Sequence, residues 1–189
     1  MKQEYTSEEF IAELERQTAQ AGTLASGLSE PALNWQPNGG KGWSVAQCLD
    51  HLVIMNAIYV KALQSAVESN RDQLEPRKNP IQPSGWFTRF FIGFEEPPPK
   101  LKLPAPKKLA PPSQLTSAIL GDFEAVQTQL VEFVRQWGET DLGDLRVKDP
   151  LFPLHNTADT ELLIIAAHNR RHLWQAAQVK SNAGFPRVG

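Results

Sequence analysis

The sequence predicts an all-α fold, a four-helix bundle with a long proline-rich crossover between the second and third helices. Four segments of roughly 22 to 26 residues carry apolar side chains at helical spacing. Ten of the fifteen prolines fall within residues 70–112, and proline cannot continue a helix interior. A long connection of this kind lets two consecutive helices run parallel. We therefore expect a single domain over residues 1–189, with the crossover at about 70–112.

The first two helices each begin with the sequence signature of a capping box. In the first, expected over 6–28, Thr6 is followed three residues later by Glu9. In the second, expected over 44–69, Ser44 is followed by Gln47. In such a box the hydroxyl and the Glu or Gln side chain satisfy two free backbone N–H groups. The apolar stripe of the first helix contains Phe10, Leu14, Ala21, Leu24 and Leu28, and that of the second contains Leu49, Leu52, Val53, Tyr59, Val60, Leu63 and Val67.

The third and fourth helices follow the crossover and show the same helical period. The third is expected over 113–137, and the fourth over 157–180 with Thr157 near its start. Their inward positions are Leu115, Ile119, Phe123, Val126 and Leu130 in the third helix and Leu162, Ile165, Ala166 and Leu173 in the fourth. No strand-rich block is present in the sequence.

The crossover contains one segment that differs from its proline-rich surroundings. The sequence GWFTRFFIGF, residues 85–94, holds five aromatic side chains and has the pattern of a short helix. Aromatic side chains in this number need cover from water. We therefore expect the segment to pack on the bundle, and a homodimer interface is the alternative.

Composition and charge exclude several classes of function. Nineteen basic and twenty-one acidic residues give a net charge of −2, so nothing favours binding to nucleic acid or to an anionic membrane. No apolar stretch approaches the roughly 20 residues that span a bilayer. The single cysteine, Cys48, cannot form an intramolecular disulfide, and the N-terminal sequence lacks a signal-peptide core. A cytoplasmic protein acting on a small-molecule substrate is expected.

Three of the four histidines lie where helical geometry can gather them around one metal ion. His168 and His172 are four residues apart, which places both imidazoles on one face of the fourth helix. His51 lies on the second helix, so the three rings converge if these two helices pack face to face. Three nitrogen ligands with an open position are typical of a catalytic metal site. Zinc, nickel, iron and manganese are the candidate ions, and the reacting group would be water or a thiol on the metal.

The alternative is that the histidines are structural. A His-x-x-x-His pair arises by chance on many helices, and a buried histidine often only satisfies a backbone carbonyl. Burying three imidazoles together without compensation would cost roughly 1–3 kcal/mol per group, which favours a shared metal ion. Asn169 follows His168, so the His-Glu-x-x-His motif of metallopeptidases is absent.

Several residues around the histidines together fit one family pattern. The chain has Trp43, Ser44, Gln47 and His51 in the second helix, then His168, Arg171, His172 and Gln175 in the last. This combination resembles the DinB/YfiT-like superfamily, in which Trp-Ser opens the second helix and H-x-x-R-H-x-x-Q lies in the last. The resemblance implies a four-helix bundle with a three-histidine metal site in a pocket between helices. Relatives include S-transferases that use bacillithiol or mycothiol and a mycothiol-dependent maleylpyruvate isomerase, while many members have no assigned reaction.

Residues beside the expected ligands have competing explanations. Gln47 either orients His51 or only completes the Ser44 capping box, and the cap is favoured. Arg171 either holds a carboxylate of a thiol cofactor or pairs with a helix acid. Gln175, one turn after His172, either lines the pocket or covers a flank. Cys48 is expected to be a buried core residue rather than a metal ligand.

The leading functional hypothesis is a metal-dependent transferase that moves a low-molecular-weight thiol to an electrophilic substrate. The reaction rests on the resemblance, whereas the three-histidine site rests on the residues themselves. A metal-dependent hydrolase is the second hypothesis, although no Glu or Asp is obviously placed as its general base. A non-catalytic metal-binding or stress-associated bundle is the third. Native metal, thiol and substrate have no signature in the sequence.

Overall fold

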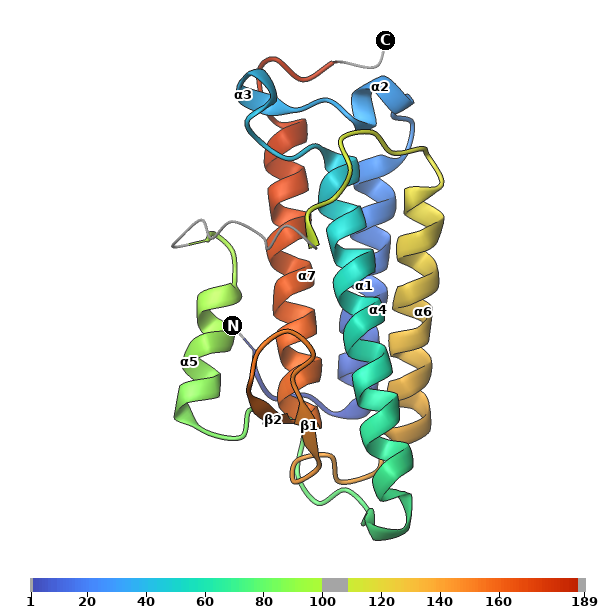
Figure 1. Cartoon of the computed structure of the whole chain (residues 1–189), viewed down its shortest axis with the longest axis vertical. Helices are drawn as coiled ribbons and strands as arrows, with labels where there is room; N and C mark the ends of the chain where they lie inside the picture. Colours follow the sequence, from blue (N-terminus) through green and yellow to red (C-terminus); the bar gives the residue numbers. More distant parts are fainter. Residues whose placement is uncertain (1, 100–108, 187–189) are drawn as a thin grey trace.

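The computed structural model describes residues 2–99 and 109–186 and is mostly helical. Figure 1 shows four long helices lying side by side with their axes roughly parallel to the long axis of the molecule. Within the described ranges, no helix is long and apolar enough to cross a membrane. The four long helices are α1 (Ser7–Ala25), α4 (Val45–Asn70), α6 (Ile119–Trp137) and α7 (Ala158–Lys180).

Apolar side chains of the four long helices form the core. Helix α4 packs against α6 and α7, and α1 packs against the same two helices. One cluster of buried side chains surrounds Phe10, Leu63 and Leu162, and a second surrounds Leu49 and Phe123. Within each long helix the buried apolar residues recur every three or four positions. Burial of these predicted stripes therefore aligns the helices.

A network of buried amides links all four long helices between the two apolar clusters. Asn169 on α7 accepts a hydrogen bond from Asn56 on α4 (3.0 Å) and donates to Gln17 on α1 (2.9 Å). It also donates to Gln127 on α6 (3.2 Å). All four side chains are at most 1% exposed. Because a shift along any helix would leave buried amides unpaired, the network fixes the register of the helices.

The predicted capping boxes are present at the starts of α1 and α4. Thr6 Oγ1 accepts from the backbone N–H of Glu9, and the Glu9 carboxylate accepts from the N–H of Thr6. Ser44 and Gln47 form the same reciprocal pair. Helix α7 begins after Thr157, whose hydroxyl accepts from the backbone of Thr160.

Two helix boundaries differ from the prediction. Helix α1 ends at Ala25 rather than near Leu28, and Gly27, with φ of 72°, turns the chain. Helix α6 begins at Ile119, six residues later than expected. The preceding segment is held in another conformation because the amide of Asn34 bonds both backbone groups of Leu115, at 2.7 and 2.9 Å.

Short elements fill the connections between the long helices. Strands β1 (Arg146–Lys148) and β2 (His155–Thr157) form a small antiparallel sheet that the sequence did not predict. The connection from α1 to α4 contains α2 (Glu30–Leu33) and α3 (Pro37–Gly40). After α4 come η1 (Arg71–Gln73) and α5 (Trp86–Glu95).

Helix α5 lies outside the group of four long helices, beside α7 (Figure 1). It occupies the predicted aromatic segment of the crossover. The helix packs as expected, but most of its aromatic side chains do not: Trp86, Phe87 and Phe90 are all more than 60% exposed. Residues 100–108 of the predicted crossover lie outside the described part of the chain.

Candidate metal centre

The structure brings His51, His168 and His172 together. His51 lies two turns into α4, and the other two histidines occupy successive turns of α7, which packs against α4. One nitrogen of each ring lies within 4.8 Å of the corresponding nitrogens of the other two. His51 and His172 are buried, and His168 is partly exposed. This is the arrangement that the sequence predicted for a shared metal ion.

Hydrogen-bond acceptors outside the cluster face the Nδ1 atoms of two of these rings. Nδ1 of His51 lies 3.0 Å from the backbone carbonyl oxygen of Leu109, and Nδ1 of His168 lies 3.3 Å from Oε2 of Glu95. A carbonyl or a carboxylate accepts a proton, so both contacts favour the tautomer with hydrogen on Nδ1. The lone pair of each ring is then on Nε2.

The two Nε2 atoms of His51 and His168 face each other at 3.1 Å. If both Nδ1 atoms carry the hydrogen, two lone pairs meet at this distance and repel each other unless a cation lies between them. Two metal–nitrogen bonds of about 2.0 Å at a tetrahedral angle separate their nitrogens by about 3.3 Å. The spacing observed therefore fits a pair of imidazoles that share a metal ion.

The third ring, that of His172, contributes an unsatisfied buried nitrogen. Its Nδ1 has no hydrogen-bond partner within the described ranges. Leaving such a group buried and unpaired costs about 1–3 kcal/mol. A metal ion coordinated at this nitrogen would compensate it.

Burial keeps the two enclosed rings uncharged. Loss of solvent, together with a smaller effect of the neighbouring His168, lowers the pKa of His51 to about 4, although the hydrogen bond to the Leu109 carbonyl acts to raise it. Loss of solvent also holds the pKa of His172 well below its ordinary value, with added effects from His168 and His51. Neutral imidazole is the form that binds metal ions, so the site is prepared for coordination at neutral pH.

Trp43 closes one side of the cluster. Its ring stacks on that of His172, with centroids 5.5 Å apart and planes at 26°, and lies 4.9 Å from that of His51. The sequence assigned Trp43 to packing and to the family pattern, not to the site. Its position excludes water from one face of two imidazoles and restricts their rotation.

Glu95 is the site residue that the sequence did not predict. It lies at the last turn of α5, and its carboxylate contacts both Nδ1 of His168 and Nη1 of Arg171 (3.6 Å). Although burial opposes ionisation, the contacts with His168 and Arg171 keep the pKa of Glu95 below its ordinary value. A carboxylate on the distal nitrogen of a ligand histidine is the common way to fix the ring and raise its basicity.

The neighbouring Glu96 anchors α5 without contacting a histidine. Its carboxylate pairs with Arg170 on α7, and Arg170 also pairs with Glu13 on α1. Burial opposes the charge of Arg170, yet these two carboxylates raise its pKa above the ordinary value. The C-terminal end of α5 is therefore fastened to two of the long helices, which holds Glu95 beside His168.

The other residues expected near the site have defined contacts. Both polar atoms of the Gln47 side chain are engaged: Oε1 accepts from Ser44 and Gln36, and Nε2 donates to the carbonyl of Pro112. These contacts match the capping hypothesis. Arg171 is buried beside Glu95, as the ion-pair hypothesis predicts. Gln175 is partly buried and interacts with the imidazole of His172.

Cys48 lies in the core next to Leu49 and contributes no ligand atom to the histidine cluster. Burial raises the pKa of its thiol far above the ordinary value. The thiol is therefore protonated at neutral pH, which removes it as a metal ligand or nucleophile.

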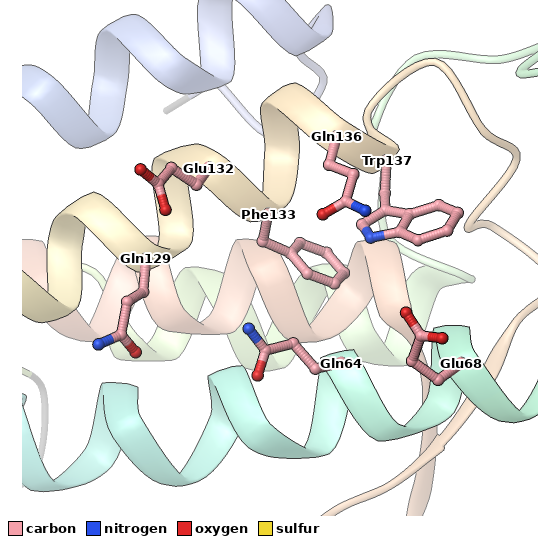
Figure 2. A pocket seen from close by; sticks show the side chains of 7 residues that line it. All are labelled: Gln64, Glu68, Gln129, Glu132, Phe133, Gln136 and Trp137. Atoms are coloured by element: carbon pink, nitrogen blue, oxygen red, sulfur yellow. The ribbon is translucent and has the colours of Figure 1, made fainter.

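Two hollows on the surface lie away from the histidine cluster. Figure 2 shows one between α4 and α6, lined by Gln64 and Glu68 on one side and by Phe133 and Trp137 on the other. A second hollow lies near Asn79 and Asp159. Neither contains a residue of the histidine cluster, so the chemistry of the candidate site is separate from both.

Comparison with known proteins places the chain in a wider group. A family model described as the DinB superfamily matches residues 13–176. The match includes all three clustered histidines, Trp43 and Glu95. No curated protein and no solved structure matches the chain significantly.

Proposed function

We propose that this chain, which belongs to the DinB superfamily, is a metal-dependent enzyme that transfers a low-molecular-weight thiol to an electrophilic substrate. The convergence of His51, His168 and His172 carries the metal part of the proposal. The transfer reaction rests on the resemblance of the motif residues to a superfamily that includes thiol-dependent S-transferases. We also propose that the four long helices constitute one four-helix-bundle domain, with the proline-rich segment as its crossover.

The three histidines would hold a divalent ion such as zinc, nickel, iron or manganese. Such an ion supplies Lewis acidity, which lowers the pKa of a thiol or water molecule that coordinates to it. The chain contributes the geometry: the Leu109 carbonyl and Glu95 orient two rings, and Trp43 shields two of the three. Three protein ligands leave coordination positions for substrates.

Hydrolysis is less well supported than thiol transfer. A metal-dependent hydrolase needs a general base near the attacking water. The potential ligand group in the described part of the chain contains three histidines and no carboxylate. Glu95 is the carboxylate in contact with it, but it lies against Nδ1 of His168, on the side of the ring away from the facing Nε2 atoms.

Metal content, measured by mass spectrometry on untagged protein, tests the first half of the proposal. Wild-type protein should contain about one equivalent of a divalent metal, and His51→Ala and His172→Ala should lose it. His155→Ala is the matched control, because His155 is the fourth histidine and lies exposed in β2. Equal metal content in all four proteins would refute the site, as would its absence from the wild type.

An activity screen tests the second half. Metal-loaded protein would be incubated with an electrophile and with bacillithiol, mycothiol or glutathione, and loss of the thiol would be followed. Turnover that requires a thiol and disappears in His172→Ala supports S-transfer. Unchanged turnover in that variant would refute the mechanism, and turnover without any thiol would favour hydrolysis. A protein that binds metal and shows neither activity would be a non-catalytic metal-binding bundle.

A further inference from the structure

Helix α5 has one side fixed to the protein and one side exposed to solvent. Ile92 is its single fully buried side chain and belongs to the apolar cluster around Phe10 and Leu63. Glu95 and Glu96, at its C-terminal end, are held by Arg171 and Arg170. In Figure 1 α5 lies beside α7, and no other helix is drawn on its opposite side.

The exposed side of α5 is aromatic. Trp86, Phe87, Phe90 and Phe91 are 81, 64, 66 and 39% exposed. At about 100° per residue, these four positions fall within an arc of about 140°, and Ile92 lies outside it. We call these four side chains the aromatic face of α5. No acidic or basic side chain interrupts that arc, because Arg89 lies outside it and pairs with Glu4.

The aromatic face is larger than an ordinary monomer surface requires. With about 200 Å² for each fully exposed aromatic side chain, the four side chains together present roughly 500 Å² on one side of the helix. A patch of this size is near the upper end for a soluble monomer and usually marks an interaction site. A standard protein–protein interface buries about 800 Å² on each partner. The aromatic face would thus supply more than half of one side, and polar residues at its edges would supply the rest.

We propose that the aromatic face of α5 binds the same face of a second copy of this chain, forming a two-fold symmetric dimer. A two-fold axis pairs each surface with itself, which suits a patch that is uniformly apolar and carries no charge of its own. If the two-fold axis is perpendicular to α5, the two copies of the helix lie antiparallel and their helix dipoles interact favourably. Aromatic rings pack edge to face across such a contact and fill the centre of the interface.

The electrostatics favour a protein partner over a membrane. Helices that bind membrane surfaces carry several lysines or arginines beside their apolar side. Helix α5 carries only Arg89, which is paired with Glu4, and ends in Glu95. The whole chain has a net charge of −2. An anionic lipid surface would repel the acidic end of α5 and the negatively charged chain.

The test is the oligomeric state of full-length protein, measured by analytical ultracentrifugation over the micromolar range. Wild type should be a dimer, and Phe87→Ser/Phe90→Ser should be a monomer with at least about a 100-fold higher dissociation constant, because each substitution acts twice in a symmetric dimer. Phe152→Ser/Leu154→Ser is the matched control, since these side chains are 53 and 54% exposed in the loop between β1 and β2. Far-UV circular dichroism of each variant verifies that it is folded.

Every outcome decides the proposal. A dimer lost in the α5 variant and kept in the control supports it. A monomeric wild type overturns it, as does a dimer that survives in the α5 variant. Wild type that stays monomeric and sediments with phosphatidylcholine vesicles would assign the face to a membrane instead.

Cross-linking provides an independent readout. The only native cysteine, Cys48, is buried, so one cysteine introduced on α5 would be the sole exposed thiol. Near a two-fold axis a residue meets its own copy. Mild oxidation should therefore give a covalent dimer for at least one of Trp86→Cys, Phe87→Cys and Phe90→Cys, and none for Phe152→Cys. The absence of a covalent dimer in all three would place the axis elsewhere and refute the interface.

Discussion

Glu161 offers the sharpest quantitative prediction, because it is a carboxylate that the fold buries without full compensation. It lies in the first turn of α7 and is 0% exposed. Its Oε1 accepts a hydrogen bond from Asn156 at 3.0 Å, and its Oε2 has no partner in the described ranges. Burial raises the pKa of Glu161 from 4.5 to about 7; the Asn156 bond opposes this shift, and the nearby Asp149 adds to it.

The shift converts directly into a pH dependence of stability. A pKa that is higher in the folded state means that folding favours the protonated acid, so its contribution is fully present below pH 4.5 and is lost as the pH rises to about 7. A difference of about 2.5 units corresponds to roughly 3 kcal/mol at 1.36 kcal/mol per unit. That is a large share of the roughly 5–15 kcal/mol that stabilises an ordinary domain.

Glu161→Gln removes the titration while keeping an oxygen for Asn156. Urea denaturation followed by circular dichroism gives the free energy of unfolding of each protein. The difference between variant and wild type should be more favourable to the variant at pH 8 than at pH 5, by roughly 2–3 kcal/mol. Glu68→Gln, at an exposed position of α4, controls for loss of a surface charge. The same difference at both pH values would refute the buried, unsatisfied carboxylate.

Three further substitutions test other contacts. Glu95→Gln should weaken metal binding about 10–100-fold, measured by competition with a chelator. Glu96→Gln loosens only the anchor of α5 and should weaken metal binding less, because Glu95 is the residue that contacts a ligand histidine; equal effects would make both residues simple anchors of α5. Asn169→Ala should lower the free energy of unfolding by roughly 3 kcal/mol by unpairing three buried amides. Arg77→Met should lower it by about 3–5 kcal/mol, since Asp159 is left buried without its partner. Urea denaturation measures both losses, and values under about 1 kcal/mol would contradict these estimates.

Local signals predicted the starts of α1, α4 and α7, whereas a long-range contact shifted the start of α6. The capping boxes at Thr6 and Ser44 involve residues three positions apart, so a sequence contains all the information they need. The start of α6 was placed too early because Asn34, 81 positions away, binds the backbone of Leu115. Strands β1 and β2 have three residues each, which is too short for a recognisable period.

The same distinction applies to the site. The spacing of His168 and His172 is a local helical property, and the packing of α4 on α7 brings His51 to them as predicted. Glu95 could not be predicted, because it reaches His168 from an outlying helix 73 positions away in the chain. Trp43 is part of the family pattern, but its stacking on His172 follows from packing rather than from spacing.

Most of the polar side chains buried along α7 have a partner, so the two buried atoms of this helix that lack a hydrogen bond stand out. Asp159 pairs with Arg77, Asn169 joins the amide network, and Arg171 lies against Glu95. Within the described ranges, this helix leaves two buried side-chain atoms without a hydrogen bond: Oε2 of Glu161 and Nδ1 of His172. A proton resolves the first, since the raised pKa keeps much of Glu161 uncharged at neutral pH. Burial makes the same solution unfavourable for a second proton on His172, whereas a metal ion coordinated at that nitrogen would compensate it. The two atoms therefore predict stabilisation by different treatments. Acidification should stabilise the protein through Glu161, and metal loading should stabilise it through His172.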